Sequence, residues 1–133
     1  MIYTGHVIVQ HGSLVLLGLH VDGFWRLAGG KVDATDNVNS VEGVRYLAAL
    51  RELKEETGLV PPYKLKFFRS YDREGYSGTI FLARFKEMPR VVNVEKHKFK
   101  GWAWFEHDQL EQMRINRWDA EPLRAYAEDY RAN

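Results

Sequence analysis

The sequence predicts a single α+β domain, residues 1–133, in which helices pack on a mixed β-sheet. Apolar, β-rich stretches occur on both sides of one well-marked helix at residues 41–57, and a second amphipathic helix is predicted at residues 119–130. A chain of 133 residues is long enough for one hydrophobic core and too short for two. Strands before and after a central helix, followed by a terminal helix, indicate an α+β or mixed-sheet sandwich.

Composition excludes several classes of function. The net charge of +1 provides no broad basic field, so nucleic acid is not an expected partner. The absence of cysteine excludes disulfides, thiol catalysis and cysteine-ligated zinc. The N-terminus has no signal-peptide pattern and no window has the length and apolarity of a membrane span, so we expect a cytoplasmic protein without membrane contact.

The first half of the chain is expected to form two antiparallel strands, residues 2–9 and 14–19, followed by a short strand within residues 23–32. That third strand runs into Gly29-Gly30, where the backbone can turn sharply and approach a neighbour or ligand closely. Residues 33–40 are polar and turn-forming and are expected to be a loop.

The central helix has recognisable ends. Asn39 and Ser40 compete as its N-cap, and Gly58 ends it at a position that favours a left-handed residue. The helical period predicts one buried stripe, formed by Tyr46, Leu50 and Leu53.

The second half is expected to contain a hairpin with strands at residues 64–71 and 79–85, whose connecting loop could carry specificity. A strand of alternating aromatics follows at residues 101–105, with Trp102 and Trp104 facing the core. Asp108 is expected to cap a short helix that ends at Met113. The last helix should direct three residues inward: Leu123, Tyr126 and Tyr130.

Three carboxylates lie on one face of the central helix. Glu52, Glu55 and Glu56 are spaced at i, i+3 and i+4, so their like charges repel unless a cation lies among them. Hard divalent ions such as Mg²⁺ take clustered oxygen ligands. The alternative is an acidic helix face that is only solvated.

Residues 51–59, Arg-Glu-Leu-Lys-Glu-Glu-Thr-Gly-Leu, follow a Gly-Gly-Lys-Val segment, and this pattern closely resembles the signature of the Nudix hydrolases. The second half of that signature is matched in full. The first half departs from it, because Gly30 lies 21 residues before Arg51, seven more than in the family pattern. The family's first glutamate is also missing, and Glu42 or Asp33 is expected to replace it. Residues 95–105 are similar to a segment of the nucleotide-hydrolysing members.

The resemblance implies a Nudix-type α/β/α sandwich with a mixed central sheet, and hydrolysis of a nucleoside diphosphate linked to another group. Nucleoside triphosphates, cleaved to a monophosphate and pyrophosphate, are favoured by analogy. ADP-ribose, nucleotide sugars, dinucleoside polyphosphates and a capped RNA 5′ end stay open as substrates, as does a homodimer. Two other readings are a nucleotide-sensing Nudix module without catalysis, and a structural domain with an incidental acidic helix.

The expected cofactor is Mg²⁺, with Mn²⁺ as an alternative. Glu55 and Glu56 are the first candidate ligands, joined by Glu52 and the backbone carbonyl near Gly30. Such ions would neutralise the charge of a pyrophosphate and acidify a bound water.

The remaining roles concern the proton and the substrate. Glu52 or Glu95 would accept the proton of the attacking water, and Arg51 would orient a glutamate, as the resemblance suggests. The residues expected to bind substrate are Gly29, Gly30, Lys31, Trp25 and Tyr76. Tyr71 and Trp118 are further stacking candidates, and His20 and His97 are candidate phosphate contacts; for all of these side chains, structural packing or plain surface exposure is the alternative.

Overall fold

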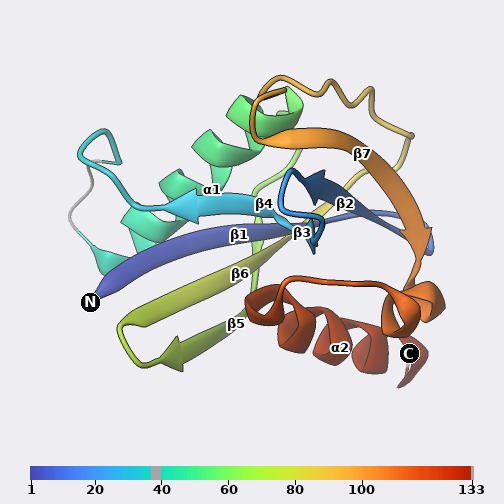
Figure 1. The fold of residues 1–133 in the computed structure, drawn as a ribbon. Helices are drawn as coiled ribbons and strands as arrows, with labels where there is room; N and C mark the ends of the chain where they lie inside the picture. The colour runs from blue at the N-terminus through green and yellow to red at the C-terminus, as the bar shows by residue number, and fades with distance from the viewer. Residues whose placement is uncertain (37–39, 133) are drawn as a thin grey trace.

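The computed structural model describes residues 1–36 and 40–132, without the side chains of residues 41 and 42. Within these ranges, a seven-stranded sheet lies between two long helices, α1 on one face and α2 on the other (Figure 1). The elements are β1 (Ile2–His11), β2 (Leu14–His20), β3 (Trp25–Arg26), β4 (Ala28–Lys31), α1 (Val41–Thr57), β5 (Lys66–Arg73), β6 (Tyr76–Arg84), β7 (Phe99–Glu106), the 3₁₀-helix η1 (His107–Gln112) and α2 (Arg117–Ala132).

The sheet is mixed, as the sequence predicts. Its main path is β3-β2-β1-β6-β5, while β4 pairs with β1 and β7 pairs with β2. The central pair, β1 and β6, is parallel, and the other pairs are antiparallel. Parallel pairing of β1 with β6 requires a crossover, and α1 lies on the connection between them.

Two cores form because successive strand residues point to opposite faces. In β1, Val7 and Val9 pack toward α1, and Ile8 between them packs toward α2. In the same way, Leu16 of β2 joins the first core while Val15 and Leu17 join the second. Burial on both faces explains why these strands are continuous apolar runs.

Helix α1 has the predicted ends. The Ser40 hydroxyl oxygen accepts a hydrogen bond from the Gly43 N–H at 3.0 Å, so Ser40 is the N-cap. Gly58 has a φ of 75° and donates its N–H to the Lys54 carbonyl at 2.9 Å. Leu53 is fully buried, and Tyr46 and Leu50 pack beside it. Ser40 was the competing candidate; Asn39, predicted as the cap because Glu42 follows it three residues later, lies outside the described residues.

Two turn predictions are wrong. Gly29 and Gly30 lie inside β4 and pair with β1, so the close backbone approach is present without a sharp turn. The hairpin connection is only Glu74-Gly75, with Gly75 at a φ of 80°, and Tyr76 is the first residue of β6. The long specificity loop predicted from residue 72 to 78 therefore does not exist.

The C-terminal helices begin elsewhere than predicted. Helix η1 begins at His107 with Glu106 as its N-cap, so Asp108 lies inside the first turn and does not cap it. Helix α2 begins at Arg117 rather than residue 119, and buries Leu123 and Tyr126 against the sheet. Trp102 and Trp104 pack against the core on the α1 side, as predicted. Among the described helices, none has the length and apolarity to cross a membrane.

Helix α1 can pack on β1 because Gly5 has no side chain. A Cβ at Gly5 would lie 2.2 Å from the Arg45 carbonyl oxygen. We therefore expect Gly5→Ala to lower the free energy of unfolding by about 1–3 kcal/mol through overpacking. The control is Gly101→Ala, where an added Cβ meets no atom within 4 Å. Equal denaturant midpoints for the two variants would contradict this account.

Candidate active site

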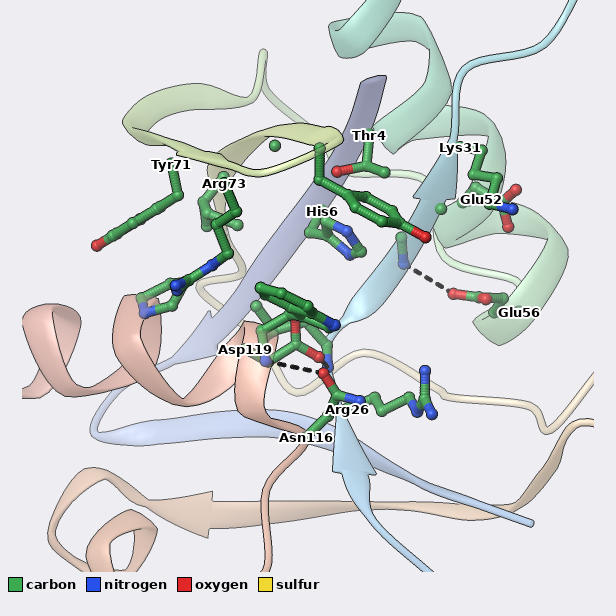
Figure 2. A pocket seen from close by; sticks show the side chains of 18 of the residues that line it. Thr4, His6, Arg26, Lys31, Glu52, Glu56, Tyr71, Arg73, Asn116 and Asp119 are labelled. Carbon is green, nitrogen blue, oxygen red and sulfur yellow. Dashed lines mark hydrogen bonds between the residues drawn. The ribbon is translucent and has the colours of Figure 1, made fainter. Parts of the chain in front are cut away.

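A cavity of about 530 Å³ opens between the N-terminal end of α2, the sheet and the C-terminal half of α1 (Figure 2). Its volume is within the range of small-molecule sites. Carboxylates of α1 lie at one end, and aromatic and polar side chains near α2 lie at the other. The lining includes Thr4, His6, Arg26, Gly29, Gly30, Lys31, Glu52, Glu56, Tyr71, Arg73, Tyr76, Lys98, Asn116, Trp118 and Asp119.

Glu56 is the most buried carboxylate of the cavity, with no exposed side-chain surface. One oxygen, Oε1, accepts the Gly29 N–H at 2.9 Å, and the other, Oε2, accepts Lys98 Nζ at 2.7 Å. Burial raises the pKa of Glu56 to about 7, although the bonds from Lys98 and Gly29 oppose that rise. A carboxylate of this kind needs a nearby cation to remain ionised.

Glu52 lies one helical turn earlier, against the backbone of β4. A Cβ on Gly30 would lie 2.7 Å from the Glu52 carboxyl carbon, so the glycine makes room for this side chain. Glu52 Oε1 accepts Arg51 Nη1 at 3.0 Å. Burial raises the pKa of Glu52, and the charges of Lys98 and Arg51 oppose that rise.

Glu95 completes a group of three carboxylates. Oxygen atoms of Glu52, Glu56 and Glu95 lie within 4.8 Å of one another. Glu95 Oε1 is buried and has no hydrogen-bond partner, and Lys98 Nζ is 4.0 Å away. An unsatisfied buried oxygen beside two other carboxylates fits a hard divalent cation. Within the described residues, the predicted Glu52 and Glu56 are thus joined by Glu95 rather than by Glu55.

Glu55 lies at the rim instead. Its side chain is 47% exposed, it does not line the cavity, and its contact is with Arg51 Nη1 at 3.3 Å. The prediction of Glu55 as a first metal ligand is not supported by this position. The helical spacing puts Glu55 on the same broad face as Glu52, but its side chain points toward solvent.

Arg51 is fixed by an aspartate that sequence reasoning missed. Asp36, whose side chain is 2% exposed, accepts Arg51 Nε at 3.1 Å and Nη2 at 3.0 Å. The hydrogen bonds that Arg51 donates to Asp36 are the main cause that raises the pKa of Arg51. Two acids were expected to replace the missing glutamate. Asp33 Oδ2 forms an ion pair with Arg51 Nη2 at 3.3 Å, and the Glu42 side chain lies outside the described residues. Asp36 thus takes the position that orients Arg51 toward Glu52.

The far end of the cavity combines stacked rings with buried polar groups. Tyr76 and Trp118 stack with centroids 5.9 Å apart and planes inclined by 24°. Asp119 is buried and its Oδ2 accepts the Leu27 N–H at 3.1 Å; burial raises its pKa. His6 lies beside it with Nδ1 unpartnered, and burial lowers the pKa of His6.

The other predicted substrate residues divide into two groups. Lys31, Tyr71 and Tyr76 line the cavity, together with the backbone of Gly29 and Gly30. Trp25 does not: its ring packs edge-on against Phe105 at 4.9 Å, so the alternative of core packing holds. Two predicted phosphate contacts also lie elsewhere, because His20 pairs with Asp22 and His97 is exposed outside the lining.

The sequence matches the NUDIX domain family model over residues 3–126. The chain therefore belongs to the Nudix family, and its class is that of the Nudix pyrophosphohydrolases. No curated protein matches the sequence.

Solved structures share the fold. A structure from a study of MutT from Aliivibrio salmonicida and Vibrio cholerae has 22% identity and a TM-score of 0.77, and covers 96% of this chain and 98% of its own. The NUDIX domain of Shewanella oneidensis NrtR, complexed with ADP ribose, has 20% identity and a TM-score of 0.76, covering 100% and 89%. A C. elegans Ap4A hydrolase has 18% identity and a TM-score of 0.73, covering 100% of both chains.

Burial of Glu56 predicts an unusual pH dependence for the metal-free protein. Its folded pKa of about 7 is above the ordinary value of 4.5, so the folded state holds this proton more tightly than the unfolded chain. In EDTA, the Glu56 contribution should therefore lower the free energy of unfolding by roughly 1–3 kcal/mol as the pH rises from 4.5 to about 7. Urea titrations of the protein and of Glu56→Gln measure this slope. If the free energy of unfolding depended on pH in the same way for both proteins, Glu56 would not be the group with the raised pKa.

Proposed function

We propose that the protein hydrolyses a nucleoside triphosphate to a nucleoside monophosphate and pyrophosphate. The observation that carries the proposal is that one cavity joins a cluster of carboxylates to a pair of stacked aromatic rings (Figure 2). A polyphosphate requires cation-filled oxygen sites, and a nucleobase requires flat apolar surfaces with a few polar groups. The cavity offers both at opposite ends.

At the phosphate end, Glu52, Glu56 and Glu95 would hold Mg²⁺ or Mn²⁺. When bound, such a cation neutralises phosphate charge and lowers the pKa of a bound water. The protein's own part is to fix the oxygens: the Gly29 N–H holds one oxygen of Glu56, and Arg51 holds one oxygen of Glu52. Lys31 and Gly30 line the same end and would bind phosphate oxygens.

Glu52 is the proposed proton acceptor. The water oxygen forms a bond to one phosphorus while the bond from that phosphorus to the bridging oxygen breaks, and the leaving group departs with the electron pair. The water proton passes to Glu52, whose carboxylate lines the phosphate end of the cavity and is held there by Arg51. Arg51 positions Glu52 and is itself held by Asp36. Glu95 is the alternative acceptor, because its Oε1 has no other partner.

At the opposite end, the base would stack on Trp118 or on Tyr76. Both residues are exposed, at 38% and 37%, and both line the cavity. Asn116 and Asp119 lie beside them and would bind the polar edge of the base. Arg73 lies 4.9 Å from the centroid of the Trp118 ring, which holds the ring in place.

The competing substrates are ADP-ribose, nucleotide sugars, dinucleoside polyphosphates and a capped RNA 5′ end, and the competing role is sensing without cleavage. The similarity to the NrtR domain complexed with ADP ribose is the observation that favours ADP-ribose as the second candidate. We also propose that the protein is cytoplasmic and forms a homodimer. Size-exclusion chromatography with light scattering tests the dimer.

We expect Glu56→Gln to abolish turnover of every substrate while retaining the fold, because the amide cannot replace the buried carboxylate as a cation ligand. Products from a panel of nucleotides with Mg²⁺ and with Mn²⁺, separated by chromatography, measure this. The matched control is Glu87→Gln, an exposed position outside the cavity, which should retain full activity. Unchanged turnover in Glu56→Gln would contradict the role, and binding without any product would support the sensing alternative.

A further inference from the structure

Lys98 contacts carboxylate oxygens of two residues that are proposed to bind the metal. Its Nζ is 2.7 Å from Glu56 Oε2 and 4.0 Å from Glu95 Oε1. The Lys98 ammonium donates a hydrogen bond to Glu56 Oε2, and the carboxylates of Glu52 and Glu95 belong to the same group of acids. In this structure, Lys98 is therefore the cation that neutralises the buried Glu56.

Lys98 and a metal compete for one atom. Glu56 Oε1 accepts the Gly29 N–H, whereas Oε2 carries no backbone bond and accepts only the Lys98 ammonium, so a cation that binds Oε2 takes the place of Lys98. Two cations on one carboxylate oxygen in a buried site repel each other strongly. A metal at Glu56 must therefore displace the Lys98 ammonium.

The surroundings permit this displacement. The Lys98 backbone is held at both ends, because its N–H donates to the Glu95 carbonyl at 3.0 Å and its carbonyl accepts the Val21 N–H at 3.0 Å. Its side chain is 35% exposed, lines the cavity and has four methylene groups along which to rotate. The backbone can thus stay fixed while the ammonium moves within the cavity.

A metal at Glu56 would not displace the arginines that line the cavity from their acidic partners. Arg26 pairs with Asp22 and Arg73 pairs with Glu121, and neither of these acids lines the cavity. A metal at Glu56 leaves both pairs intact. Lys98, by contrast, loses its partner at the moment when phosphate oxygens enter the same end of the cavity.

We propose that Lys98 is a transferable counter-ion: it neutralises Glu56 before the metal binds, and the metal then releases it to bind a phosphate of the substrate. This inference rests on the proposed function, since it assumes a metal at Glu56 and a phosphate ligand. It gives Lys98 two opposite effects, because it opposes the binding of metal alone and favours the binding of nucleotide with metal.

The two effects can be measured separately by calorimetry without turnover. Lys98→Met should bind Mn²⁺ alone at least about ten-fold more tightly than the unmodified protein, because the competing charge is gone. The same variant should bind a nucleoside triphosphate in Ca²⁺ about ten-fold more weakly, because a phosphate contact is lost. Lys96→Met, an exposed lysine two residues earlier with the same change of charge, should alter neither affinity.

Lys98→Gln is the second variant, in case loss of the partner of Glu56 prevents Lys98→Met from folding. Weaker or unchanged Mn²⁺ binding in a folded Lys98 variant would overturn the inference, because a merely structural lysine gives that result. A different result would contradict the proposed function. If Glu56 binds no metal, the unmodified protein and Glu56→Gln would bind Mn²⁺ equally, and this result does not depend on the Lys98 variants.

Discussion

The buried carboxylate of Glu56 is the constraint on which the site depends. It has no exposed surface, and its two oxygens are satisfied by a strand N–H and by an ammonium. An ionised group in such a place is unfavourable without these partners. The sheet therefore supplies a backbone donor from β4, and the segment before β7 supplies a cation, so three distant parts of the chain meet at one side chain.

Glycine makes that meeting possible. Gly5 lets α1 approach β1, and Gly30 leaves space for the carboxylate of Glu52. Gly29 has a φ of 150°, and a Cβ there would collide with His6. The double glycine thus acts within a paired strand, where it brings the backbone of β4 against both glutamates. The fold and the site share these close contacts, so a change in helix packing should also move the carboxylates.

Local signals in the sequence were sufficient for the central helix, because caps and period are encoded within a few residues. Ser40, Gly58 and the stripe at Leu53 are of this kind. The mixed sheet and two flanking helices also followed from the order of patterns. The hairpin was misjudged because glycines at both 75 and 78 suggested a long loop, whereas only Gly75 has a positive φ.

The site residues that could be predicted are those that lie close together in the sequence. Glu52 and Glu56 follow from one helical turn and a family resemblance, but Asp36 and Asp119 carry no signal of their own. Asp36 is one polar residue in a polar loop, and it meets Arg51 only after folding. Asp119 reaches Leu27, 92 residues away. Trp25 shows the reverse error, since its place near the glycines suggested stacking on a ligand although its ring packs against Phe105.

The central claim is that Glu52, Glu56 and Glu95 together bind a divalent cation. Crystals soaked in Mn²⁺ and measured at the manganese absorption edge test it most directly, since anomalous scattering identifies the ion. We expect one or more anomalous peaks in contact with oxygens of Glu56 and of at least one of the other two glutamates, with Lys98 Nζ no longer bonded to Glu56. Full occupancy of manganese elsewhere, with the Lys98–Glu56 pair intact, would contradict the account.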